Sequence, residues 1–498
     1  ADAALLRGCY DCLIDAREIY RKLPVGGRAA SAAAAAAWVF ETDLLIALRE
    51  KEIGLPSSSA LTEARRIARE LPRDLEAGRY IELVEAIPGC ELGTLESEVK
   101  ELPAHLLGRT ATADTRAWLV RGKLRKAVRD YLQIALACID PIIDENLSAA
   151  ALGAGSSPSS TGATQPEASL LLRYRVAISK PDATPELEAV RASEPRFVEA
   201  SLFIARNEIG RLPFEGPRQA KVHLDEVLVR FPASTAATYL AASYHQLVGD
   251  YAEALRLYER TLDLRPDHDP ALLGRVISLS NLGRTRDAID AATRLIARGE
   301  PYSVNAYYWR ARNLHALGRL DDARRDVSAA KELGGSEDLL LLAGTIEYEQ
   351  GDLDVAQADL TIVVNADADG RACEARWYLG LVDRQRKRWS SARHALEDAM
   401  TCYQQRARTT TDQLHSLQAR SDLDPTYRDR AAAGLEAAVA ADTRQQDIAA
   451  LDAAGIAAAG DDFAGARSLV DLAAEDPALA DRVAKLRSWL DRSHRVSP

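Results

Sequence analysis

Residues 249-GDYAEALRLYERTLDLRP-266 decide the fold, because their pattern returns along the chain at nearly constant spacing. Each copy has an apolar-periodic run, a glycine turn and a second apolar-periodic run that opens near an alanine. These alanines are Ala220, Ala254, Ala288, Ala323, Ala356 and Ala392, with steps of 34, 34, 35, 33 and 36 residues. Self-similarity at this period indicates an array of helical hairpins.

The repeated residue types have direct physical reasons. An alanine early in the second helix lets two helices approach closely, where a larger side chain would hold them apart. A glycine such as Gly249 or Gly283 suits the left-handed backbone that ends a helix. Pro232 and Pro266 stop the second helix of their units. One hairpin cannot bury its apolar face alone, so we expect neighbouring hairpins to stack.

These residues resemble the tetratricopeptide repeat family. The stretch 249–266 is similar to the second half of its repeat, and 306-AYYWRARNLHALGRLDDA-323 is similar to the first half with its turn. The run 377-WYLGLVDRQRKRWSSA-392 carries the aromatic-x-Leu-Gly pattern of a first helix, although its turn, Lys387-Arg388-Trp389, has no glycine. The resemblance implies an all-α, right-handed α-solenoid that binds protein or peptide partners.

The resemblance also implies where partners would bind. In this family a concave groove is lined by the first helices of successive units. The matching positions here are aromatic residues and arginines, namely Tyr239, Tyr308, Arg312, Tyr348, Trp377 and Arg384. Such side chains suit an extended or helical peptide. The alternative is that some of these rings only pack between helices.

Outside the array the pattern is weaker. Residues 1–147 read as a helical region with degenerate repeats, including one helix over 1–22, a long helix over 29–54, and further helices over 95–107 and 113–147. Ala64 lies in the position of the repeated alanine. Residues 148–169 are rich in Gly, Ser and Pro, which predicts a flexible linker or loop.

The array is predicted over 170–403 and is followed by a helical C-terminal region, 404–498. Helices are expected on both sides of 421-SDLDP-425. Ala466 lies 74 residues after Ala392, close to two repeat periods, which predicts one further repeat. The run 478–493 is expected to be a capping helix, because an array needs a polar end.

Charge and composition limit the classes of partner and the compartment that we expect for this chain. The 498 residues carry a net charge of −11, which argues against nucleic-acid binding because that needs clustered Lys and Arg. No run of 18 apolar residues is present, so no membrane-spanning helix is expected. The chain starts at Ala1 and its only methionine is Met400. We therefore expect an exported protein after signal removal, with a trimmed cytoplasmic protein as the alternative.

Two short patterns could carry chemistry. Cys9 and Cys12 are the only cysteines close in sequence, and they could form a local disulfide, remain free packed thiols or act as a redox pair. Asn365, Asp367 and Asp369 resemble half of a calcium loop. Such a loop needs a carboxylate where this chain has Arg376, so we expect no metal site. His268 lies in a polar turn between repeats and is expected to be structural.

Three functions follow as hypotheses. The first is a non-enzymatic scaffold or adaptor, since no catalytic or cofactor-binding motif is visible. The second is a structural subunit that assembles head to tail through the ends of the solenoid, as an oligomer or extracellular filament. The third is a thiol redox protein that uses Cys9 and Cys12.

Overall fold

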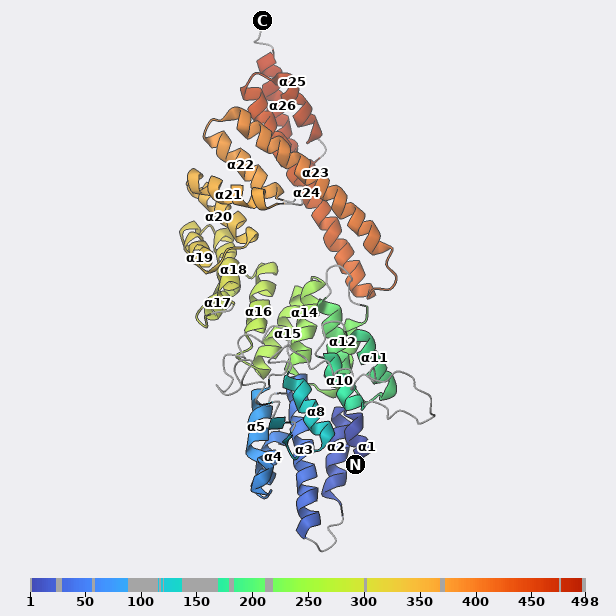
Figure 1. Cartoon of the computed structure of the whole chain (residues 1–498). Helices are drawn as coiled ribbons and strands as arrows, with labels where there is room; N and C mark the ends of the chain where they lie inside the picture. The colour runs from blue at the N-terminus through green and yellow to red at the C-terminus, as the bar shows by residue number, and fades with distance from the viewer. Residues whose placement is uncertain are drawn as a thin grey trace, which may run out of the picture. The chain divides into compact units, whose positions relative to one another are not determined.

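The protein is described by a computed structural model in which all regular structure of the described residues is helical (Figure 1). The described residues are 2–23, 29–55, 59–87, 115, 118–119, 121–136, 169–178, 183–210, 218–299, 302–367, 372–473 and 476–494. They form two compact units, which we call the N-terminal unit (1–247 with 253–271) and the C-terminal unit (248–252 with 272–498). This division falls inside the predicted array, whereas residues 148–168 lie outside the described part.

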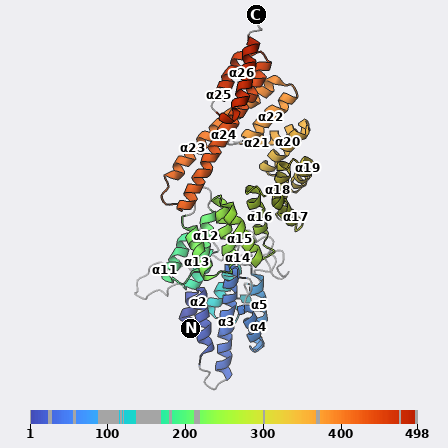
Figure 2. The same cartoon turned by 180° about the vertical axis from the view of Figure 1, so that it is seen from behind.

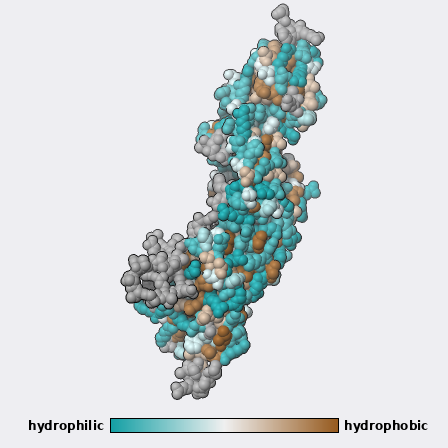
Figure 3. All heavy atoms as spheres, turned by 90° about the vertical axis from the view of Figure 1, so that its right-hand side faces the viewer, coloured by the Kyte–Doolittle hydropathy of each residue, from teal (hydrophilic) through white to brown (hydrophobic). Residues whose placement is uncertain are grey.

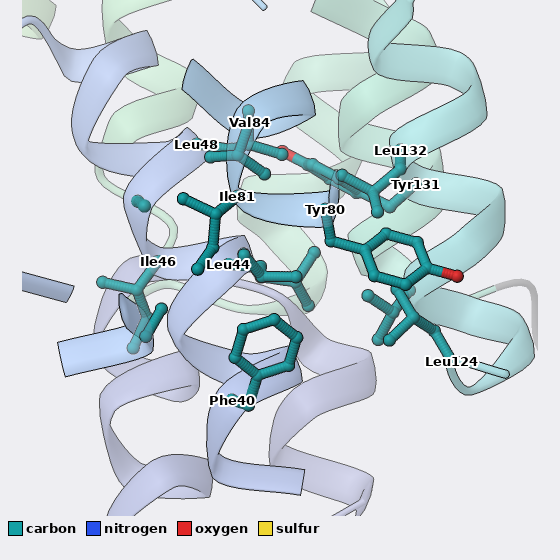
Figure 4. Packing of buried hydrophobic residues seen from close by; sticks show 14 of the residues in the cluster. Phe40, Leu44, Ile46, Leu48, Tyr80, Ile81, Val84, Leu124, Tyr131 and Leu132 are labelled. Carbon is teal, nitrogen blue, oxygen red and sulfur yellow. The ribbon is translucent and has the colours of Figure 1, made fainter. Parts of the chain in front are cut away.

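The N-terminal unit begins with a group of helices around α3. These are α1 (Asp2–Arg7), α2 (Tyr10–Arg21), α3 (Ala29–Ile53), α4 (Ser59–Ala68), α5 (Ala77–Ala86) and α8 (Lys126–Ala135). The side chains of α3 fill the centre of the core, where Phe40 and Leu44 meet Tyr80 of α5 and Leu132 of α8 (Figure 4). Ala64 of α4 is fully buried, as a repeat-like register requires.

Two predicted helices are interrupted. The helix expected over 1–22 breaks at Gly8, which has φ +75° and ends α1 before α2 begins at Tyr10. A Cβ atom on Gly8 would lie 2.5 Å from the Cα atom of Leu171, so only glycine fits this close approach. The helix expected over 113–147 was predicted to be interrupted at Pro141, which lies outside the described residues, and its described part bends earlier, at 122–125, before α8. The helix expected over 95–107 lies outside the described residues.

The same unit continues into further helical hairpins. Their helices are α10 (Leu170–Ile178), α11 (Thr184–Ser193), α12 (Glu199–Gly210), α13 (Ala220–Arg230), α14 (Thr235–Leu247) and most of α15 (Tyr251–Leu264). The backbone N–H of Thr235 donates to the carbonyl of Gly54 over 2.9 Å, so the start of α14 satisfies the end of α3. The degenerate N-terminal helices and the first clear repeats therefore share one unit.

The C-terminal unit holds the remaining hairpins of the array. Their helices are α16 (Asp269–Asn281), α17 (Thr285–Ile296), α18 (Ser303–Ala316), α19 (Leu320–Leu333), α20 (Glu337–Gln350), α21 (Leu353–Ala366), α22 (Cys373–Gln385) and α23 (Trp389–Gln418). All six repeated alanines have 0% exposure, as close helix packing predicts. The predicted all-α solenoid of helical hairpins is confirmed.

The turns of the hairpins keep a left-handed residue even where the glycine is missing. Gly318 has φ +70°, and Lys387 takes a φ of +61° at the equivalent turn before α23. A non-glycine residue is uncommon in this region of backbone space. The departure in sequence at 387–389 therefore leaves the turn geometry unchanged.

Ala323→Leu is expected to lower the free energy of unfolding of the C-terminal unit by about 1–3 kcal/mol, because overpacking forces neighbouring helices apart. Ala323 has 0% exposure and belongs to the core between α18 and α20. Ala437→Leu, at an exposed position of α24, is the matched control. Urea unfolding followed by circular dichroism measures both variants. Equal midpoints for the two variants would contradict the register of the repeat.

The region after the array contains two long helices. α23 runs without a break from Trp389 to Gln418, and α24 runs from Pro425 to Ala459. The two helices lie side by side along their length (Figure 2). The helices expected on both sides of 421–425 are α23 and α24, and their length accounts for the 74-residue spacing between Ala392 and Ala466. We call residues 404–444, the elongated parts of both helices, the arm.

Two further α-helices follow α24. α25 (Phe463–Leu472) carries Ala466, which has 0% exposure, and α26 (Ala480–His494) is the last helix. The second half of α24 thus serves as the first helix of a repeat whose second helix is α25. Teal, polar side chains cover much of the face of the molecule in view, with scattered apolar residues between them (Figure 3).

Candidate partner-binding face

The first helices of the C-terminal unit carry most of the predicted binding residues. Tyr308 and Arg312 lie four residues apart on α18, so they share one face of the helix. Burial raises the pKa of the half-buried Tyr308 hydroxyl, an effect that the nearby Arg312 opposes. The exposed Arg312 guanidinium lies 4.9 Å from the ring centroid of Trp309. Arg312 has no carboxylate partner within ion-pair distance in the part of the chain that the structure describes.

Two of the predicted aromatic residues pack against other rings. Tyr348 of α20 makes an edge contact with Tyr378, with ring centroids 5.6 Å apart. Tyr239 lies on α14 in the N-terminal unit, and its ring centroid is 4.8 Å from that of His268. Both contacts fit the alternative that these rings fill space between helices.

Trp377 and Arg384 of α22 contact a carboxylate of the chain itself. Trp377 Nε1 donates to Asp452 Oδ2 over 3.1 Å, and Arg384 Nη1 donates to Asp452 Oδ1 over 3.1 Å. Arg482 Nη2 of α26 reaches the same Oδ1 over 2.6 Å. Asp452 therefore joins α22, α24 and α26, and the donors that were expected to hold a partner are partly used to dock α24.

Beside this carboxylate lies an open cavity of about 500 Å³, which we call the terminal groove. Its walls come from α22, α23, α24 and α26, and its lining residues are Arg384, Trp389, Leu451, Asp452, Gly455, Ile456, Arg482, Lys485, Leu486 and Trp489. Trp389 is 48% exposed and Trp489 is 41% exposed, which is high for the largest apolar side chain. The groove thus combines two accessible indole rings with three cations.

Sequence reasoning identified only Arg384 of this groove. Two signals were present in the sequence: Trp389 follows the turn without glycine, and Trp489 stands in an otherwise polar last helix. Neither signal reveals that both rings line the same cavity, because that depends on how α24 and α26 pack onto α22.

The four cysteines among the described residues form two buried disulfides. Cys9 and Cys12 are joined with an S–S distance of 2.04 Å, and Arg196 Nη2 lies 3.3 Å from Cys12 Sγ. Both residues have 0% exposure, so an external thiolate has no access and the redox hypothesis gains no support. The second disulfide, Cys373–Cys402, was missed because its residues are 29 positions apart.

The possible calcium loop and His268 have structural roles. Asp367 Oδ2 accepts a hydrogen bond from the backbone N–H of Ala372 over 2.7 Å and pairs with Arg376 over 2.9 Å. Asp369 lies outside the described residues, and no group of three or more candidate metal ligands occurs among those that are described. Burial lowers the pKa of His268 to about 4, and its Nδ1 accepts a hydrogen bond from Ala271 N–H at the start of α16.

A comparison with protein families decides the assignment. The family model described as "Tetratricopeptide repeat" matches residues 273–337 and 341–407, which are α16 to α23 of the C-terminal unit. The chain contains tetratricopeptide repeats. No curated protein matches the chain. None of the described helices is both long enough and apolar enough to cross a membrane.

Solved structures of tetratricopeptide repeat proteins are similar at low identity. A repeat protein from Parabacteroides merdae is 17% identical, with 46% of this chain and 93% of that chain covered and a TM-score of 0.37. The Cut9–Hcn1 structure of the APC/C is 12% identical, with 97% and 93% covered and a TM-score of 0.45. YrrB, described as a TPR protein with an unusual peptide-binding site, is 17% identical, with 36% and 91% covered and a TM-score of 0.31. Likeness at this level does not extend to function.

Proposed function

We propose that this tetratricopeptide repeat protein is a non-enzymatic scaffold that binds protein partners through the first-helix face of its C-terminal unit. The observation that carries the proposal is the pair Tyr308 and Arg312 on α18, an aromatic ring and, on the same helix face, a guanidinium that has no carboxylate partner among the described residues. Such a pair binds a peptide by stacking and by charge-assisted hydrogen bonds to a carboxylate. The proposal includes no cofactor and no nucleic-acid partner.

The test compares Tyr308→Ala and Arg312→Ala with the parent chain in affinity capture from the source organism, followed by measurement of Kd for each captured protein. We expect each variant to weaken binding at least about tenfold, as loss of an interface anchor does. The effect of Arg312→Ala should be larger at low salt, because an exposed charge contact is screened by ions. Arg325→Ala is the matched control, since Arg325 lies exposed on the second helix α19.

The competing proposal is self-assembly through the ends of the solenoid. It predicts that the Tyr308 and Arg312 variants keep every partner, while removal of α26 abolishes a high-mass species in sedimentation. That pair of results would replace the scaffold proposal with the assembly proposal. Loss of partners in the Arg325→Ala control as well would also count against a specific first-helix face.

A further inference from the structure

We propose that the terminal groove binds an acidic segment of a protein partner, and that an aromatic side chain of this segment lies against Trp389 and Trp489. This inference rests on the proposed scaffold function but uses a different set of residues. It also differs from the expected groove of first helices, because Trp389 starts a second helix and Trp489 belongs to the last helix.

The cations of the groove retain hydrogen-bonding capacity for a ligand carboxylate. Arg384 and Arg482 each donate one guanidinium nitrogen to Asp452. An arginine carries five N–H groups, and no further acceptor for either side chain occurs among the described residues. Within the described part of the chain, the ion-pair partner of Lys485 is Asp481 on the same helix, over 3.0 Å at an exposed position. Exposed pairs of this kind are weak and exchange readily.

The charge balance of the groove selects an anion. Its lining contains Arg384, Arg482 and Lys485 against a single carboxylate, Asp452, which is itself 7% exposed and already accepts three hydrogen bonds. The chain as a whole has a net charge of −11, so this local excess of positive charge is opposite to the average surface. A partner with carboxylates is therefore complementary to this cavity and is repelled elsewhere.

The apolar wall of the groove selects an aromatic or bulky side chain. Trp489 is backed by Phe463 of α25, with ring centroids 6.2 Å apart, which holds its indole in place. Ile456 and Leu486 add further apolar side chains to the lining of the groove. Covering an exposed indole with another ring gains both buried area and offset stacking.

The size of the groove favours a peptide over a second copy of the chain. A cavity of about 500 Å³ lies in the range of sites that enclose a few side chains. A stable dimer needs roughly 800 Å² of surface from each partner, which is far more than such a pocket supplies. A short segment with one aromatic ring and flanking carboxylates can contact both the indole rings and the cations of the groove.

The experiment titrates the 498-residue chain into a fluorescein-labelled pentapeptide in which acidic residues flank one phenylalanine, and measures anisotropy. Two matched probes replace either the carboxylates by amides or the phenylalanine by alanine. We expect both changes to weaken binding at least about tenfold, as loss of an anchor does. Trp489→Ala should do the same, and Lys485→Ala should weaken binding more at low salt than at high salt.

Matched controls separate the groove from the rest of the surface. Leu472→Ala removes an exposed apolar side chain of α25, and Arg467→Ala removes an exposed cation of the same helix. Both should bind the acidic probe like the parent. Equal binding of the amide probe, or unchanged binding by Trp489→Ala, would overturn the proposal.

The same measurements distinguish a peptide from a second copy of the chain as the occupant of the groove. They also distinguish failure of the terminal-groove proposal from failure of the scaffold proposal. If Trp489→Ala instead dissociates a multimer in sedimentation and no probe binds, a second copy of the chain occupies the groove and the inference is wrong. If no probe binds while Tyr308→Ala and Arg312→Ala still lose captured partners, the scaffold function stands and only the terminal groove is refuted.

Discussion

The Arg49→Met variant is expected to lose about 3–5 kcal/mol of the free energy of unfolding of the N-terminal unit, because it removes one partner of a buried ionic cluster. Arg49 is fully buried in α3. Its Nη1 donates to Glu52 Oε2 and its Nη2 donates to the carbonyl of Gly8, both over 2.8 Å. Its Nε lies 3.5 Å from Glu199 Oε1. Methionine keeps an apolar side chain of similar length but carries no charge. The carboxylates of Glu52 and Glu199 therefore lose one cationic partner.

Hydrogen exchange of the α3 amides measures this loss in the N-terminal unit alone, since it reports local opening free energies. Glu52 should remain charged, because Arg175 Nη1 and the Tyr131 hydroxyl still bond its Oε1 over 2.7 and 2.8 Å. Glu199 is then the unpaired group. Arg49→Met combined with Glu199→Leu restores the charge balance and should recover a large part of the loss. Protection within about 1 kcal/mol of the parent in Arg49→Met alone would contradict the role of the cluster.

The pH dependence of the parent adds an independent check. Burial raises the pKa of Glu199 from 4.5 to about 7, although Arg49 opposes the shift. A raised folded-state pKa means that the protonated form favours folding. This contribution is therefore complete below about pH 4.5 and is lost as the pH rises through 7. Protection factors of α3 should fall across this window in the parent and fall less in Glu199→Gln.

The repeat array could be predicted because its main constraint is local. Each repeated alanine fills a site where two helices nearly touch, and a larger residue there is costly at every copy. The same reasoning identified Ala64 and Ala466, which are both fully buried. The pairing of Tyr308 with Arg312 on one face also follows from helix geometry alone, since residues four apart are neighbours.

Other features depend on contacts between residues that are far apart in sequence. The repeat pattern does not predict such contacts. Arg49 and Arg175 are ordinary charged residues in the sequence, yet both are fully buried because they meet at Glu52. The terminal groove likewise needs Trp389 and Trp489 to line the same cavity. The length of α23 and α24 was not predicted for a different reason, since the 74-residue spacing and the turn at 421–425 do not state how far each helix extends.

Removal of the Cys373–Cys402 disulfide is expected to lower the free energy of unfolding of the C-terminal unit by roughly 3–4 kcal/mol. The disulfide links the first residue of α22 to α23 across a sequence separation of 29. In the chain-entropy account, the bond restricts the unfolded state by an amount that grows with the length of the closed loop. The Cys9–Cys12 bond closes a separation of only 3 residues and should stabilise the N-terminal unit by about 2 kcal/mol.

Urea unfolding of Cys373→Ala/Cys402→Ala, with and without dithiothreitol, separates the covalent link from side-chain packing. Without reductant the double variant should be less stable than the parent, and with reductant the two should nearly coincide. An equal difference in both conditions would assign the effect to lost sulfur packing instead. Alkylation of the parent in intact source cells before lysis also tests the expected export, because disulfides persist mainly in oxidising compartments.

The folded region around this disulfide should survive its removal, because an ionic clamp joins the same helices. Arg406 of α23 donates from Nη2 to Glu374 Oε1 of α22 and to Asp442 Oδ1 of α24, both over 2.6 Å. We call Arg406, Glu374 and Asp442 the clamp. Arg406 and Asp442 lie near the two ends of the arm, and the clamp joins α22, α23 and α24 without a covalent bond. Since α22 also carries Arg384 of the terminal groove, Cys373→Ala/Cys402→Ala should bind the acidic probe like the parent at low denaturant concentration. Weaker probe binding under those conditions would mean that the disulfide, rather than the clamp, positions the groove.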